Sequence, residues 1–359
     1  MTKFIPGLEL NESFYKEIVQ PILEANFSGL RYSAALIGYG SDVLGFDTPV
    51  SIDHEWGPRL LLFLSQEDYE KYRMEIDDTL SKKLPYTFKK FSTHFSTGRV
   101  QWQEYISSGS IAHKVWIQTI PSFFKLSLGF NPYSDIKVLD WLTFSEQKLL
   151  EITSGKVYYD GLGELNFIRA KFDYYPKDIW LYLLSAQWSS IAQEEAFVGR
   201  CGDVGDEIGS RLIAARTIQK LMKLCFLMER QYAPYSKWLG KAFAQLPCAG
   251  KLTPIFENIL VAHSWKQREQ HMSKAYEIVA RMHNRLSLTS PLETNVSHYY
   301  NRPYYVIHAD RFAEAIRDVI SKKEVRDLPA GVGAIDQFIT GMYMLEQPQL
   351  CQKLKAIFA

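Results

Sequence analysis

The sequence lacks the features that most directly reveal a function. Its four cysteines are scattered and include no Cys-x-x-Cys pair, so they favour buried thiols of a reducing compartment over a disulfide framework or zinc site. The eight histidines show no metal-ligand spacing such as His-x-x-x-His with a nearby acid. There is also no Gly-x-x-x-x-Gly-Lys-Ser/Thr motif, which excludes a P-loop nucleoside triphosphatase.

Long apolar runs and an excess of one charge are absent as well. No apolar run approaches the ~18 residues that a membrane span needs, and Met1–Gly7 lacks the apolar core of a signal peptide. We therefore expect a cytoplasmic protein with no membrane partner. The 41 Lys and Arg nearly balance the 40 Asp and Glu, so nucleic acid is not an expected partner.

The first part of the chain alternates short apolar runs with amphipathic segments, which implies an α/β layer structure. A helix is expected over residues 11–25, with Asn11 as its N-cap, and another over residues 66–83. Strands are expected over residues 32–37, 60–64, 113–120 and 156–159.

Strand signals vanish after Pro176, and long helical patterns take over. Helices are expected over residues 178–199, 206–232, 237–245 and 253–286, followed by a short strand at 304–308 and a helix at 310–322. At 359 residues the chain is long enough for two domains. We therefore predict one domain over residues 1–170 and a helical domain over residues 171–359.

The segment Gly38-Tyr39-Gly40-Ser41-Asp42 follows the first expected strand, and Asp53-His54-Glu55 precedes the second. A Gly-Ser turn after a strand presents backbone N–H groups to phosphate, and Gly40 has no Cβ to block the approach. If residues 53–55 are extended, the Asp53 and Glu55 carboxylates leave the same face and favour a shared Mg²⁺. The alternative is an ordinary turn and a solvated loop edge.

Gly40-Ser41 with Asp53-x-Glu55 resembles the signature of the nucleotidyltransferase superfamily, which includes DNA polymerase beta and the aminoglycoside and lincosamide adenylyltransferases. Five longer stretches, spread over nearly the whole chain, are similar to the DUF4037 family: residues 40–47, 53–60, 194–200, 232–239 and 308–312. The resemblance implies an α/β (α+β) nucleotidyltransferase-like domain with a mixed sheet, followed by an all-α helical domain. It also implies that Asp53 and Glu55 are metal carboxylates.

The sequence departs from the superfamily pattern at the third carboxylate, which is expected on a later strand. The strand at residues 113–120 offers only Gln118 and Thr119 near that position. Either Glu104 or Asp160 supplies the acid from elsewhere, or the metal site is weak.

Two groups in the helical domain are candidates for contact with substrate. Glu194 or Glu195 is expected to act as the base that takes the acceptor proton, the alternative being a solvated helix edge paired with Arg200. Lys237 is expected to reach the triphosphate and Tyr235 to stack on the base or acceptor, the alternative being a packed interhelical corner.

These features lead to three hypotheses. The first is an enzyme that uses Mg²⁺ to move a nucleoside monophosphate, AMP from ATP or another NTP, onto a hydroxyl of a small molecule. The second is a nucleotide-binding or regulatory protein of the same fold that is weakly active or inactive, or one that modifies a protein partner. The third is a toxin–antitoxin-like interaction protein, which predicts a large exposed apolar face on the helical domain.

Overall fold

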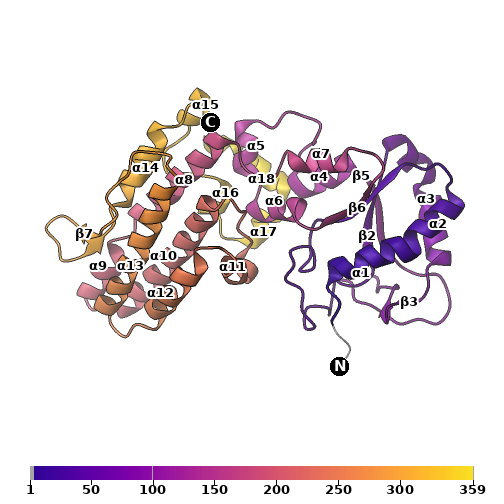
Figure 1. Cartoon of the computed structure of the whole chain (residues 1–359), viewed down its shortest axis with the longest axis horizontal. Coiled ribbons are helices and arrows are strands. Elements are labelled where there is room, and N and C mark those ends of the chain that lie inside the picture. Colours follow the sequence, from indigo (N-terminus) through magenta and orange to yellow (C-terminus); the bar gives the residue numbers. More distant parts are fainter. Residues whose placement is uncertain (1–3, 99, 359) are drawn as a thin grey trace. The chain divides into compact units, whose positions relative to one another are not determined.

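The chain forms two compact units in the computed structural model, which describes residues 4–98 and 100–358 (Figure 1). Unit 1 comprises the residues up to Ile136 together with Lys148–Asp173. Unit 2 comprises Lys137–Gln147 and the chain from Tyr174 onward. The division into folding domains at residues 170 and 171 stays a prediction.

Unit 1 is built on a mixed sheet of four strands. In spatial order these are β5 (Lys114–Thr119), β2 (Arg59–Leu64), β1 (Tyr32–Leu36) and β6 (Lys156–Asp160). β1 runs antiparallel to both β2 and β6, whereas β2 and β5 are parallel. The predicted mixed sheet is therefore confirmed. All residues of β1 and β2 are buried, including the polar Ser33 and Arg59, and the run of five apolar residues in β2 is typical of a strand covered on both faces.

The strand directions bring three chain segments to one edge of the sheet. β1 ends at this edge, and β2 and β5 begin there, because β1 is antiparallel to β2 and β2 is parallel to β5. Arg59 of β2 lies beside Lys114 of β5 in the register of the two strands. The Gly38–Asp42 turn follows β1 directly, so the topology places it near both basic residues.

The remaining elements of unit 1 are mostly helical. A continuous helix is formed by α1 (Gly7–Phe14), a π-helical turn η1 (Tyr15–Val19) and α2 (Gln20–Asn26). The other elements are α3 (Gln66–Lys83), the two-residue strands β3 (Thr87–Phe88) and β4 (Phe91–Ser92), α4 (Ile120–Leu128) and α7 (Leu165–Ala170). The bounds of α3 agree with the prediction, and the Ser65 side chain caps its first turn.

The first helix begins earlier than predicted, and Asn11 is not its N-cap. Asn11 is buried within α1, where its side chain donates to the Gly7 carbonyl at 2.8 Å and accepts the Arg59 N–H at 2.6 Å. Asp47 holds the start of the helix by accepting hydrogen bonds from the Gly7 N–H at 2.7 Å and the Trp56 indole N–H at 3.0 Å. The first helix is thus tied to the start of β2.

Unit 2 is predominantly helical, as predicted (Figure 1). Its larger elements are α5 (Val138–Thr143), α8 (Lys177–Ala192), α9 (Phe197–Asp203), α10 (Glu207–Met228), α11 (Ser236–Phe243), α12 (Ala249–Val261), α13 (Trp265–Arg285) and α14 (Ala309–Asp318). A short hairpin, β7 (Ser297–His298) and β8 (Tyr305–Val306), precedes α14. The chain ends in α15 (Lys323–Arg326), α16 (Ile335–Phe338), α17 (Met342–Leu345), α18 (Pro348–Lys353) and the 3₁₀ turn η2 (Leu354–Phe358), whereas α6 (Glu146–Thr153) crosses the unit boundary.

Two predicted helices of unit 2 are each divided in the structure. The pattern over residues 178–199 forms α8 and α9, and Gly199 lies inside α9 instead of ending a helix. The pattern over residues 253–286 forms α12 and α13, because Ser264 caps a new helix by accepting the Gln267 N–H. Apolar periodicity continues through both breaks, so it could not reveal them.

Two further findings concern the chain as a whole. The four cysteines are free thiols. Within the described part of the chain, none of the helices combines the length and the apolar character that crossing a membrane would require.

Candidate functional site

The Gly38–Asp42 turn presents an unusual series of backbone donors. Gly38 and Gly40 have φ values of +92° and +132°, which glycine adopts readily and L side chains rarely adopt. Within residues 4–98 and 100–358, no group accepts a hydrogen bond from the N–H groups of Tyr39, Gly40, Ser41 or Asp42. The Ser41 hydroxyl has no partner among these residues either. Successive free N–H groups of this kind can bind an anion.

A buried ion pair lies directly beneath this turn. Arg59 donates from Nε to Asp42 Oδ2 at 3.1 Å and from Nη2 to Asp42 Oδ1 at 2.6 Å. Arg59 Nη2 also donates to the Tyr39 carbonyl at 2.9 Å, and both charged side chains are 1% exposed. A Cβ at Gly40 would overlap this ion pair. Glycine at position 40 therefore makes room for the Arg59 guanidinium and the Asp42 carboxylate. The predicted approach of a ligand to Gly40 stays a prediction.

A second ion pair joins Glu55 to Lys114 at the same sheet edge. The Lys114 ammonium donates to Glu55 Oε2, which also accepts the Tyr39 hydroxyl at 3.2 Å. Glu55 Oε1 accepts the Gln101 N–H at 2.9 Å. Both carboxylate oxygens of Glu55 are thus engaged by protein donors.

The environment treats the two members of this pair differently. Burial alone would raise the pKa of Glu55, but the hydrogen bonds from Lys114 and the Gln101 N–H outweigh it and hold the pKa below its usual value. Burial lowers the pKa of Lys114, even though Glu55 pulls it upward. The pair therefore favours the charged form of the Glu55 carboxylate. For Lys114, the attraction of Glu55 stabilises the ammonium by less than the loss of water destabilises it.

Asp53 is separated from Glu55 in its interactions. Its side chain is 67% exposed and accepts from His54 Nδ1 at 3.0 Å, which lowers the pKa of Asp53. The prediction that Asp53 and Glu55 share a metal assumed an extended segment. Instead, Glu55 has a φ of +52° within an irregular loop, so the two-residue spacing no longer puts both carboxylates on one face.

The residues at this edge do not fit the predicted Mg²⁺. A hard cation needs free carboxylate oxygens, yet those of Glu55 bind Lys114, Tyr39 and the Gln101 N–H. No cluster of three or more His, Cys, Asp or Glu side chains suited to a metal occurs within the described ranges. Lys114 instead places a fixed positive charge against Glu55.

Both alternative sources of a third carboxylate interact with other residues. Asp160 pairs with Ser33 near the start of β1, at the opposite end of that strand from the turn. It accepts hydrogen bonds from the Ser33 hydroxyl at 2.7 Å and the Asn166 N–H at 3.0 Å. Glu104 is half-exposed, and its carboxylate lies 4.0 Å from His94 Nε2.

The two predicted bases of unit 2 have structural partners. Glu194 forms ion pairs with Arg216 and Lys220, the latter at 2.6 Å. Glu195 is buried and accepts the Ile307 and Ala309 N–H groups at 3.0 and 3.2 Å, which secures the start of α14. Burial raises the pKa of Glu195 to about 7 although those N–H groups lower it. Both carboxylates thus have partners within the protein, and the role of either as the base stays a prediction.

Tyr235 and Lys237 belong to unit 2, whereas the Gly38–Asp42 turn belongs to unit 1. Tyr235 is the N-cap residue of α11 and lines a cavity of about 50 Å³ with Glu146 and Lys223. The exposed Lys237 has its ammonium 5.0 Å from the centre of the Trp238 ring. Their roles in binding a triphosphate remain predictions.

Sequence reasoning gave no role to Asp42 and Lys114, which complete the two ion pairs at the sheet edge. Asp42 directly follows Gly40-Ser41 in the sequence, so its position next to the motif could have identified it as a residue of the site. Lys114 could be located only from the register that pairs it with Arg59.

Comparisons with curated proteins and solved structures gave one weak structural match. No curated protein matches the chain. The crystal structure of a nucleotidyltransferase-like protein from Exiguobacterium sibiricum 255-15 has 9% sequence identity and a TM-score of 0.31, with 77% of this chain and 78% of that chain covered. A likeness at this TM-score carries no argument about function.

The family model described as Domain of unknown function (DUF4037) matches residues 141–239. Two of the five predicted motif stretches, residues 194–200 and 232–239, lie in this range, and the other three lie outside it. The predicted resemblance to DUF4037 is therefore confirmed over residues 141–239.

Proposed function

We propose that unit 1 binds the phosphate groups of a nucleoside triphosphate at the Gly38–Asp42 turn, as a nucleotidyltransferase-type protein that lacks an assembled metal site. The observation that carries this proposal is the series of four unpartnered N–H groups from Tyr39 to Asp42, beside the unpartnered Ser41 hydroxyl. Successive backbone N–H groups of this kind bind anions through their partial positive charges, with no charged side chain required.

The aromatic side chains beside the turn support a nucleotide over a bare phosphate. Tyr39 is 46% exposed, and its ring lies 5.9 Å from that of Trp116. A planar base can stack on an exposed aromatic ring, which adds about 1–3 kcal/mol in comparable sites. The fixed ammonium of Lys114 replaces the positive charge that a metal would supply next to Glu55.

A second candidate is transfer of a nucleoside monophosphate to a hydroxyl of a small molecule. It is favoured by the hydrogen bond from the Tyr39 hydroxyl to Glu55, which joins the turn to one of the two predicted carboxylates. In this reaction the acceptor oxygen forms a bond to the α-phosphorus, the bond to the β-phosphate oxygen breaks, and pyrophosphate leaves. The acceptor proton passes to solvent or to a base.

Thermal unfolding with ATP, GTP, CTP and UTP tests the first candidate, each nucleotide being added with Mg²⁺ or with EDTA. We expect one nucleotide to raise the melting temperature in both conditions, because ligands that bind only the native state stabilise it. Ser41→Ala and Tyr39→Leu should reduce the shift. Asp53→Ala should leave it unchanged, because the Asp53 side chain is exposed and bonded to His54.

Two results would contradict this assignment. A wild-type protein that no nucleotide stabilises, with or without Mg²⁺, does not bind nucleotides at the turn. A shift that requires Mg²⁺ and is lost in Asp53→Ala would show that the carboxylates rearrange around a metal, which supports the transfer reaction. Pyrophosphate release with a hydroxylated acceptor would then be the direct measurement.

A further inference from the structure

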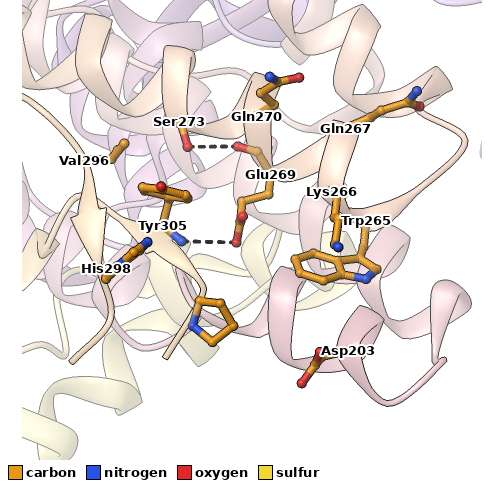
Figure 2. A pocket seen from close by; sticks show the side chains of 11 residues that line it. Asp203, Trp265, Lys266, Gln267, Glu269, Gln270, Ser273, Val296, His298 and Tyr305 are labelled. Carbon is orange, nitrogen blue, oxygen red and sulfur yellow. Dashed lines mark hydrogen bonds between the residues drawn. The ribbon is translucent and has the colours of Figure 1, made fainter. Parts of the chain in front are cut away.

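A pocket of about 750 Å³ lies in unit 2, between α9, α13 and the hairpin of β7 and β8 (Figure 2). Its volume is within the range of small-molecule sites. One wall is a single face of α13, where Lys266, Glu269, Gln270 and Ser273 follow the spacing of one helix face. His298 and Tyr305 are paired across the hairpin, and their rings lie 4.7 Å apart.

Two glycines of α9 allow this pocket to form. A Cβ at Gly199 would lie 2.6 Å from the Tyr304 ring and 2.9 Å from Glu269 Oε1. A Cβ at Gly202 would overlap the Trp265 side chain. Both positions have to be glycine for Glu269 and Trp265 to approach the α9 backbone as closely as they do.

Two carboxylates of the pocket, those of Asp203 and Glu269, accept hydrogen bonds from neutral donors. Asp203 accepts the Tyr304 hydroxyl at 3.0 Å. Glu269 accepts the Tyr305 N–H at 3.2 Å (Figure 2). Neither forms an ion pair with any of the residues described, which exclude only 1–3, 99 and 359. The nearby Lys266 ammonium lies 5.6 Å from the centre of the Trp265 ring instead.

The surroundings of Glu269 disfavour the negative charge of its carboxylate. Burial raises the pKa of Glu269 to about 7, although the Tyr305 N–H and the charge of Lys266 lower it. The other titratable groups that line the pocket are Asp203 on α9, Lys266 on α13, His298 on β7 and Tyr305 on β8. A cation in the pocket would compensate the carboxylate, and the π faces of Trp265 and Tyr305 also attract cations.

We propose that this pocket binds a small organic ammonium ion, whose charge is held by Glu269 and Asp203 and whose alkyl groups pack on Trp265 and Tyr305. An anion is disfavoured because the pocket holds two carboxylates and one ammonium. A neutral polyol would donate hydrogen bonds to the carboxylates but would not neutralise their charge. This site lies in unit 2 and does not depend on nucleotide binding in unit 1.

Isothermal titration calorimetry with choline and its uncharged isostere 3,3-dimethylbutan-1-ol tests the assignment. We expect choline to bind at least about tenfold more tightly than the isostere, which corresponds to about 1.4 kcal/mol. Glu269→Gln should weaken choline binding by a similar factor. Lys266→Met should strengthen it, because that change removes a competing positive charge from the pocket. Putrescine, a primary diamine, serves as a second charged probe.

The control is Glu277→Gln, the same substitution two turns further along α13, where the carboxylate pairs with Arg281 outside the pocket. It should leave choline binding unchanged. Lys266→Met keeps the test valid if Glu269→Gln does not fold, since Lys266 is exposed. The proposal is wrong if both charged probes fail to bind below about 10 mM, if the isostere binds as tightly as choline, or if Lys266→Met weakens binding.

Discussion

Lys114 places its ammonium against the Glu55 carboxylate, so a positive charge built into β5 stands where a divalent cation was predicted. The lysine side chain is 1% exposed and the glutamate side chain 23% exposed. Loss of Glu55 should therefore destabilise Lys114 more than loss of Lys114 destabilises Glu55, because the more buried charge has less access to water.

Glu55→Gln should destabilise unit 1 more than Lys114→Met does. The first change leaves a buried ammonium without its carboxylate, at a cost of about 3 kcal/mol. The second leaves Glu55 with the Gln101 N–H and the Tyr39 hydroxyl, and we expect a cost of about 1 kcal/mol. Urea unfolding at pH 7 measures both. Equal costs, or a larger cost for Lys114→Met, would contradict this view of the pair.

Asp42→Asn should be among the most damaging substitutions at the sheet edge. It leaves the Arg59 guanidinium, which is 1% exposed, without its charged partner, and breaking a buried pair in this way costs about 3–5 kcal/mol. Asp78→Asn is the matched control, because it removes an ion pair with Lys82 in which both side chains are at least 60% exposed. Such exposed pairs contribute less than about 1 kcal/mol. The same unfolding experiment compares the two variants.

Gly40→Ala should destabilise unit 1 far more than Gly45→Ala. Both glycines have positive φ values, +132° and +70°, so both substitutions strain the backbone, by about 1–3 kcal/mol. Only at position 40 would the new Cβ also overlap the Arg59 and Asp42 side chains, whereas no atom lies within 4 Å at position 45. Differential scanning calorimetry of the two variants should separate these effects. A similar melting temperature for both would show that the ion pair shifts without cost.

The stability of unit 2 should fall as the pH rises from about 5 to 7, in part because of Glu195. Burial raises its pKa in the folded state to about 7, above the ordinary value of 4.5. The folded protein then holds a proton that the unfolded chain has released, so stability is highest at low pH within this window. The shift corresponds to roughly 3 kcal/mol.

Glu195→Gln should reduce this decline, since an amide does not titrate. Part of the decline should remain, because the pKa values of Glu146 and Glu269 are also raised, to about 8 and 7. Unfolding curves at pH 5, 6 and 7 give the slope for each variant. A slope that Glu195→Gln leaves unaltered would mean that Glu195 titrates normally in the folded state.

The sequence predicted elements better than interactions. The strand runs and the helix over residues 66–83 were recognisable because apolar periodicity and turn residues act locally. Gly199 was interpreted as a helix stop, yet it lies within α9, where Tyr304 and Glu269 pack against it. That packing depends on a residue more than one hundred positions away, and no local pattern records it.

The candidate site shows the same limit. The Gly-Ser turn and Glu55 are at one sheet edge, as their positions around two strands suggested. The geometry of residues 53–55 was not predictable, because the positive φ of Glu55 depends on its hydrogen bonds with Gln101 in a distant loop. Lys114 joins the site only through the pairing of β2 with β5.

The first helix of the chain stabilises the sheet edge at which β2 begins. Asn11 holds the backbone where β2 starts, and Asp47 fastens Gly7 to Trp56. A shortened chain that began at β1 would leave the Arg59 N–H without its Asn11 acceptor, and Asp47 would keep only its hydrogen bond from Trp56. Engineering of unit 1 should therefore keep residues 7–26 intact, since this helical segment, which precedes the sheet in the sequence, stabilises the sheet edge beside the Gly38–Asp42 turn.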